Sequence, residues 1–223
     1  MMRLHKRNLV MGLKVIDNFL PKELFDSLKH AVESVTQPWY PYEKIDHELV
    51  NLIDKDQRKL YGFSCDVVKY KPPYMYERFP CTALAYTFHQ KVKDEYGYRK
   101  VIRCRLDRTS YRGETVTLFG PHIDLEGDDT TTVFHLTTCN GPTIIYNEKS
   151  EGVLKYVEGI DDSIKFVPEM DLTVMENVDA VENRLIMFDG DQVHSGSCAT
   201  DVAHRVVINS NFVTGEKFSE RYE

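Results

Sequence analysis

The sequence predicts one α+β domain that is mainly β, with a jelly-roll core and N-terminal helices packed on one of its sheets. Helical periodicity is confined to the first hundred residues, and short β-branched and aromatic segments recur from about residue 99. A chain of 223 residues can bury a core large enough to fold without disulfides or structural metals. We therefore expect a single domain over 1–223, with a helical and aromatic-rich support over about 1–98 and the jelly-roll core over about 99–213.

Two segments carry helix signals. In "NFLPKELFDSLKHAVES", Asn18 offers a start, Pro21 suits a first turn, and apolar residues follow at helical spacing. In "TALAYTFHQKVKDEYG", apolar residues again line one side and Gly97 provides a stop. Both segments precede the β-rich half, so we expect them to brace one face of a sheet.

Residues 37–80, which lie between these helices, are rich in aromatics and prolines. Such a segment is typical of irregular structure packed on a core, and it also suits an aromatic wall or lid over a substrate. The sequence leaves both interpretations open.

Eight segments after residue 98 have the composition of short strands, with Gly, Pro, Asn and Asp between them. They are "RKVIRCRL", "TVTLF", "TTTVFHLT", "PTIIYNE", "VLKYVEG", "SIKFVPE", "RLIMFD" and "HRVVINSNFV". This spacing favours a sandwich or barrel, and with helices in front it predicts a jelly roll.

Composition restricts the partners and the compartment. The net charge of −7 disfavours a protein that grips nucleic acid through phosphates, which makes nucleic acid a less expected partner. The cysteine number, five, is odd and no C-x-x-C spacing occurs, which indicates thiols in a reducing compartment. We find no signal peptide or membrane-spanning stretch, so we expect a cytoplasmic protein without a membrane partner.

The chemistry centres on "FGPHIDLEGDD". His122 and Asp124 are two residues apart, so on an extended segment they project from the same face. His194 follows an apolar strand and a short acidic turn much later in the chain. Two His and one carboxylate form the facial triad that suits non-haem Fe(II) and leaves the opposite side of the metal open. A closed zinc site would require a fourth protein ligand.

Arg205 opens the strand-like segment "RVVINSNF". A guanidinium forks onto a carboxylate, so a buried arginine near a metal suggests a small molecule that carries a carboxylate. A surface or structural salt bridge is the alternative for Arg205 considered in isolation.

Other motifs fit less well. "DLEGDD" resembles a calcium loop, but counting from Asp124 puts Gly127 fourth rather than sixth and His135 at the twelfth position, where Glu is required. Ser195 has no G-x-S-x-G elbow around it, which argues against a serine hydrolase.

The order H-x-D, a distant His-Ser-Gly, and Arg at the head of a final apolar strand resembles the Fe(II)/2-oxoglutarate-dependent oxygenases. The similarity is to their prolyl-hydroxylase-like branch, including bacterial and phage members. "LKVIDNFLPKELFDSLKHAVES" and "RLIMFDGDQVHSGSCATDVAHRVVINSNF" resemble its opening and closing segments. The resemblance spans roughly 13–213, carries little over 37–80, and implies a double-stranded β-helix.

By this resemblance His122, Asp124 and His194 are the iron ligands and catalytic residues, and Arg205 binds the distal carboxylate of 2-oxoglutarate. It also points to His135, where relatives often have Tyr, as a further co-substrate residue. A core histidine is the alternative for His135. Further candidates for the cofactor pocket are Tyr146, Asn209 and Asn211; the two asparagines share a strand face with Arg205 by the period of two.

The implied activity is hydroxylation of a C–H bond in a prime substrate. The cofactors are Fe(II), 2-oxoglutarate as co-substrate and O₂, with ascorbate as an optional reductant, and succinate and CO₂ are released. Collagen-type prolyl hydroxylases generally have Lys in place of Arg205, and many relatives have an aromatic where this chain has Asn209 to Asn211. The substrate therefore stays open among a prolyl or other peptidyl residue and a small molecule.

Two alternatives remain at this stage: a nucleobase or nucleotide hydroxylase or demethylase of the same superfamily, and a metal-binding jelly-roll module without turnover. The resemblance places the chain in a bacterial or phage-infected cell. The sequence does not indicate an oligomeric state.

Overall fold

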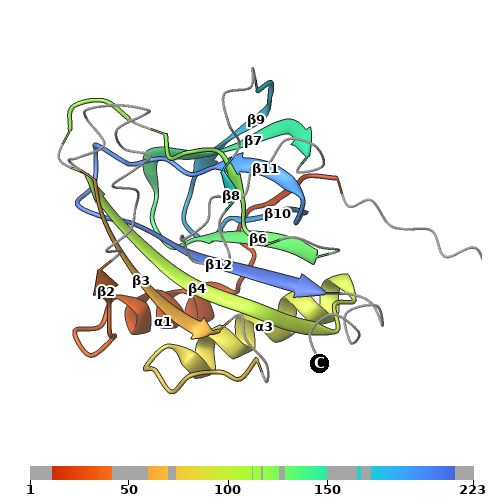
Figure 1. Ribbon diagram of the computed structural model, residues 1–223. Coiled ribbons are helices and arrows are strands. Elements are labelled where there is room, and N and C mark those ends of the chain that lie inside the picture. The colour runs from red at the N-terminus through yellow and green to blue at the C-terminus, as the bar shows by residue number, and fades with distance from the viewer. Residues whose placement is uncertain are drawn as a thin grey trace, which may run out of the picture.

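Two antiparallel sheets lie face to face in the computed structural model, and two helices cover the outer side of the larger sheet (Figure 1). The structure describes residues 12–41, 60–69, 74–111, 113–116, 118–125, 129–149, 165–166 and 172–213.

The larger sheet has seven strands in the order β1-β10-β6-β12-β4-β3-β2. Their bounds are β1 Lys14–Ile16, β10 Leu185–Asp189, β6 Asp129–His135, β12 Arg205–Val213, β4 Lys100–Tyr111, β3 Leu60–Val68 and β2 Tyr40–Pro41. The smaller sheet has the order β8-β5-β11-β7-β9. Its strands are β8 Lys165–Phe166, β5 His122–Ile123, β11 Gln192–Ser195, β7 Cys139–Lys149 and β9 Val174–Ala180.

Both expected helices are present. Helix α1 spans Lys22–Glu33 and begins directly after Pro21, whose fixed φ suits the start of a helix. Helix α3 spans Thr82–Tyr96 and ends at Gly97, which adopts the left-handed φ of 72° and donates its N–H to the carbonyl of Lys93.

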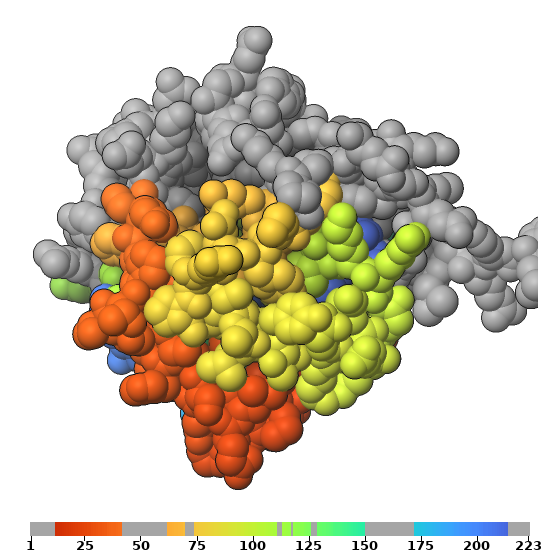
Figure 2. All heavy atoms as spheres, turned by 90° about the horizontal axis from the view of Figure 1, so that it is seen from below, coloured from red at the N-terminus to blue at the C-terminus, as the bar shows by residue number. Residues whose placement is uncertain are grey.

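The helices pack on the large sheet around Phe134, a fully buried residue of β6. Its ring stacks on Phe88 of α3 at 4.7 Å between centroids and meets Phe25 of α1 edge-on at 6.0 Å. Figure 2 shows this side of the molecule, where the red-orange and yellow residues of α1 and α3 form the surface over the strands. The outer face of the large sheet is therefore occupied by apolar packing.

The inner face of the same sheet is different because side chains alternate along a strand. On β12, Ile208 and Phe212 join the core beneath the helices, whereas Val207 joins an apolar layer between the two sheets. Asn209 and Asn211 share the inward face with Val207. Polar side chains are thus presented to the space between the sheets, where the smaller sheet faces them.

The structure confirms the mainly β class, the sheet pair and the helices on one sheet. It adds strands that the sequence did not predict: β9 and β11 in the smaller sheet, and β2 and β3 from the aromatic-rich region 37–80. Of that region, 42–59 and 70–73, to which the expectation of a lid partly applies, lie outside the described residues. The described part of the expected strand 115–119 forms an isolated bridge, Leu118 with Ser197. The expected strand 153–159 lies outside the described residues.

None of the described helices is long and apolar enough to cross a membrane. No disulfide links the five cysteines, all of which lie in the described part of the chain.

We predict that Phe134→Ala lowers the free energy of unfolding by about 3–5 kcal/mol, because it leaves a cavity where both helices meet the sheet. The matched control is Val35→Ala, since Val35 is fully exposed and its loss should change stability by less than about 0.5 kcal/mol. Denaturant unfolding of both variants measures the difference. Equal stability of the two variants would show that the helices do not depend on this contact.

Candidate metal centre

Strand pairing brings the three predicted ligands together. His122 belongs to β5, Asp124 follows that strand directly, and His194 belongs to β11. In the antiparallel pair β5–β11, His194 is the register partner of His122. Because His122 and Asp124 are two residues apart, the three side chains project toward the same space between the sheets.

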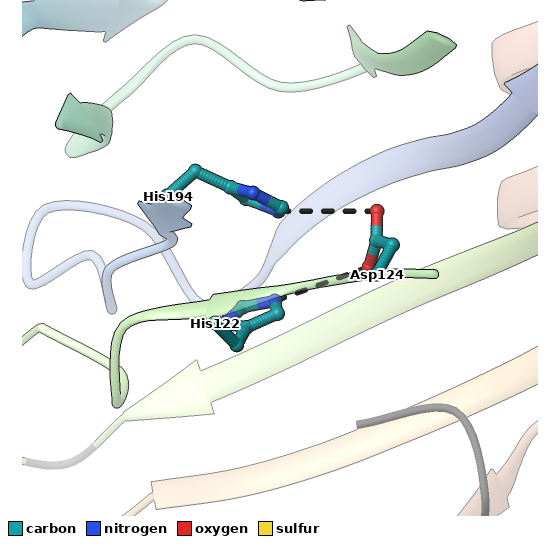
Figure 3. Close-up of side chains that lie close together, drawn as sticks. All are labelled: His122, Asp124 and His194. Atoms are coloured by element: carbon teal, nitrogen blue, oxygen red, sulfur yellow. Dashed lines mark ion pairs between the residues drawn. The ribbon is translucent and has the colours of Figure 1, made fainter. Parts of the chain in front are cut away.

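The ligand atoms face one another. Nε2 of His122 lies 3.9 Å from Oδ1 of Asp124, and Nε2 of His194 lies 3.8 Å from Oδ2. Figure 3 shows the two imidazoles pointing at opposite oxygens of the carboxylate. One ligand atom from each residue lies within 4.8 Å of the others. These separations are too long for hydrogen bonds, and they suit atoms that share a cation about 2 Å from each.

The protonation of the imidazoles also suits a metal. Nδ1 of His122 lies 2.9 Å from the carbonyl oxygen of Gly120, and Nδ1 of His194 lies 3.1 Å from that of Gln192. A carbonyl only accepts hydrogen bonds, so each Nδ1 carries a proton and each Nε2 is the ring nitrogen that faces Asp124 and is placed to bind a metal. Burial, with a further contribution from His122, lowers the pKa of His194 to about 4, which keeps it neutral at neutral pH.

Asp124 is buried, with 2% of its surface exposed, and is nevertheless held as an anion. Burial raises its pKa, but the positive charge of Arg103 and the contributions of the two imidazoles outweigh burial and hold the pKa well below its usual range. Nη1 of Arg103 lies 3.2 Å from Oδ1, and Nδ2 of Asn209 donates a hydrogen bond of 2.9 Å to Oδ2.

Asp129 is a second buried carboxyl group near this site, and it provides a contrast. Its Oδ2 accepts a hydrogen bond from Asn211, whereas Oδ1 has no partner. No cation lies within ion-pair distance of it among the described residues, and burial raises its pKa to about 7. The pKa values of the two acids shift in opposite directions because Asp124 lies beside Arg103 and the two imidazoles, whereas burial and the nearby Asp124 charge dominate at Asp129.

Arg205 lies close to the His-Asp-His group. Its side chain is buried, Nε donates to the carbonyl of Gly141, and Nη2 donates to Oγ1 of Thr143. Thr143 is two residues along β7 from Ile145, the register partner of His194. No carboxylate lies within ion-pair distance of the guanidinium in the described part of the chain. Among the described residues, Arg205 is therefore a buried cation that forms no ion pair, although the charge of Asp107 acts on it from a longer distance.

His135 lies next to Arg205. It occupies β6 opposite Val207, which is two residues from Arg205 on the same strand face. The ring is fully buried, and neither nitrogen has a hydrogen-bond partner among the described residues. Burial, and then the charge of Arg205, lower the pKa of His135 well below its usual value, so the imidazole is neutral.

The other predicted pocket residues divide. Asn209 reaches the centre through its hydrogen bond to Asp124. Tyr146 does not reach it: this residue packs with Ile144 and Val193 on the opposite face of β7 from Ile145, which points between the sheets. The expectation that Tyr146 lines the pocket is corrected by this alternation along β7.

Sequence reasoning missed Arg103 and Thr143. A signal for Arg103 was present, because Arg103 and Arg105 recur with a period of two in the apolar segment "RKVIRCRL". Two charges on one face of a strand in the middle of a sheet indicate a charged partner within the fold. Thr143 had no such signal, since threonine is common in strands.

Comparison with solved structures agrees with this fold. A crystal structure of a Pseudomonas putida prolyl-4-hydroxylase has a TM-score of 0.50 at 12% identity, covering 91% of this chain and 92% of that one. A Trichoplax adhaerens prolyl hydroxylase, in complex with a peptide fragment of the hypoxia inducible factor oxygen degradation domain, has a TM-score of 0.56 at 15% identity. The match covers 95% of this chain and 88% of that one. A Burkholderia pseudomallei oxidoreductase of the 2OG-Fe(II) oxygenase family has a TM-score of 0.54 at 11% identity, and the match covers 92% of this chain and 86% of that one.

No protein-family model matches the chain, and no curated protein sequence matches it. The structural similarity extends over more than nine-tenths of the chain, and at this level of identity it establishes the fold. The chain thus has the double-stranded β-helix fold of prolyl 4-hydroxylases and 2OG-Fe(II) oxygenases, with a His-Asp-His group of the facial-triad type between its two sheets.

Proposed function

We propose that this protein is an Fe(II)- and 2-oxoglutarate-dependent dioxygenase that hydroxylates a C–H bond of a prime substrate. The observation that carries the proposal is the pairing of two features in one fold. A three-residue metal group lies beside a buried arginine that lacks an anionic partner among the described residues. The metal group alone would suit a binding module, but the arginine adds a site for a carboxylate.

The donor set fits iron(II). Two imidazole Nε2 atoms and one carboxylate come from neighbouring strands, and the group includes no fourth His, Cys, Asp or Glu among the described residues. Three protein ligands leave coordination positions for other molecules. When bound there, iron(II) with 2-oxoglutarate and O₂ supplies the oxidation that inserts oxygen into a C–H bond and releases succinate and CO₂.

Two residues of the protein fit the far end of 2-oxoglutarate. The Arg205 guanidinium supplies the charge that a distal carboxylate requires, and its contacts to Gly141 and Thr143 hold it in place. The neutral His135 beside it has a ring N–H that bonds to no described residue and can donate to the same carboxylate. The surrounding apolar layer, which includes Val133 and Val207, excludes water and strengthens these contacts.

The prime substrate is proposed by class only. Two of the similar structures are described as prolyl hydroxylases, so a proline-containing peptide is the first class to test. Other residues near the metal group, such as Asn209 and Asn211, do not indicate a narrower substrate class. A small molecule remains the alternative.

We predict that the Fe(II)-loaded protein converts 2-oxoglutarate to succinate slowly without a prime substrate, and that the conversion requires both iron and O₂. Succinate is quantified after incubation with and without each component. If the protein binds a divalent metal and 2-oxoglutarate but forms no succinate with or without candidate peptides, it is a non-catalytic module.

We predict that His122→Ala and Asp124→Ala each abolish iron-dependent succinate formation, because each removes a ligand and leaves an incomplete metal site. Circular dichroism checks that the fold is retained. His30→Ala is the matched control, since His30 is exposed on α1, and it should leave turnover unchanged. Full activity in both ligand variants would contradict the assignment of the metal group.

We predict that Arg205→Lys raises the KM for 2-oxoglutarate by roughly 10- to 100-fold, because a lysine keeps the charge but loses the forked hydrogen bonds. Arg205→Ala should raise it further. Steady-state succinate formation at varied 2-oxoglutarate separates KM from kcat. An unchanged KM in both variants would mean that another residue binds the co-substrate.

A further inference from the structure

Arg103 lies in the middle of the large sheet, on β4 opposite Asn211 of β12. Its side chain is buried, and its Nη1 lies 3.2 Å from Oδ1 of Asp124. Burying a guanidinium is costly unless a negative charge compensates it. Arg103 and Asp124 therefore compensate each other in the protein without metal.

The carboxylate of Asp124 is held from the large sheet on both sides. Arg103 approaches Oδ1 from β4, and Asn209 donates to Oδ2 from β12. The two imidazoles approach the same oxygens from the smaller sheet, as Figure 3 shows. Asp124 is thus the residue at which polar and charged side chains of the two sheets meet in the interior.

The two contacts from the large sheet differ in kind. The contact from Asn209 is a well-formed hydrogen bond of 2.9 Å. Nη1 of Arg103 is close to Oδ1 but forms no aligned hydrogen bond with any described atom. Asn209 therefore fixes the rotation of the carboxylate, and Arg103 acts through its charge. Oδ1 keeps a lone pair that is not engaged by a hydrogen bond to Arg103.

We propose that Arg103 is a positioning residue that substitutes for the charge of the metal in the metal-free protein, and that Asn209 orients the Asp124 carboxylate for metal binding. The inference rests on the proposed function only for the identity of the metal. Removal of Arg103 and removal of Asn209, which both contact Asp124, should therefore change the metal affinity in opposite directions.

The effects are opposite for an electrostatic reason. Arg103 and a divalent metal are both cations beside the same carboxylate, so either one relieves the cost of burying Asp124, and each repels the other. Removing Arg103 destabilises the metal-free protein more than the loaded one, and by linkage the metal then binds more tightly. Removing Asn209 leaves the carboxylate free to rotate, and the metal then binds about 10-fold more weakly.

The test compares melting temperatures in EDTA and in saturating Mn(II), which serves as an O₂-stable substitute for Fe(II). We expect Arg103→Met to lower the melting temperature in EDTA by roughly 6–20 °C, and Mn(II) to recover at least half of that loss. The matched control is Arg184→Met, because Arg184 is paired with Asp17 rather than with a residue of the metal group. The melting temperature of Arg184→Met should fall by the same amount in EDTA and in Mn(II).

Titration of Mn(II) by calorimetry provides the second readout. We expect tighter binding to Arg103→Met than to the wild type, and weaker binding to Asn209→Ala. Equal losses of stability of Arg103→Met with and without Mn(II), or weaker Mn(II) binding, would overturn the proposal and make Arg103 a structural residue.

A double variant covers the case in which Arg103→Met does not fold. Arg103→Met combined with Asp124→Asn removes both charges, so in EDTA it should be more stable than Arg103→Met alone. A double variant no more stable than the single one would show that Arg103 acts through packing, against the proposal. Neither readout involves turnover, so the absence of succinate would contradict the proposed function and leave the role of Arg103 unaffected.

Discussion

The Asp124 carboxylate is a negative charge buried between two sheets, and the arrangement of the centre depends on how that charge is compensated. Its two oxygens are contacted by Arg103 and Asn209 from one sheet and face His122 and His194 from the other. The compensation keeps the group ionised despite burial. A buried anion flanked by two imidazoles whose Nε2 atoms face it is a strong site for a divalent cation.

The large sheet can contribute residues to this centre because its two faces differ: one packs against helices and the other faces the site. The helices pack on the outer face around Phe134 and supply apolar burial there. The inner face is then free to carry polar and charged residues, among them Asn209 and Arg205 on β12. Alternation along one strand thereby connects the stability of the fold to the chemistry of the site.

The sequence predicted the fold class and the ligand group because both depend on local patterns. A spacing of two residues suffices to place His122 beside Asp124, and His194 was added as the third ligand because it follows the apolar segment "RLIMFD" and completes the motif order of the resemblance. The strand β11 that carries His194, and its pairing with β5, are known only from the structure. The sequence also predicted that Asn209 shares a face with Arg205, which β12 bears out.

Features that depend on which face of a strand points inward could not be predicted in the same way. Ile144 and Ile145 are both apolar, so nothing local indicated that Ile145 faces the interior and that Tyr146 therefore faces away. The pairing of Arg103 with Asp124 joins strands from different sheets, which no spacing in the sequence reveals. Strands β2 and β3 were not predicted because aromatic residues and prolines dominate the composition of residues 37–80.

A crystal structure with a redox-silent divalent metal and a 2-oxoglutarate mimic tests the central claim most directly. The account predicts one metal on Nε2 of His122, Nε2 of His194 and one oxygen of Asp124, with the distal carboxylate of the mimic on Arg205. A metal bound elsewhere, or a mimic whose carboxylate avoids Arg205, would contradict it.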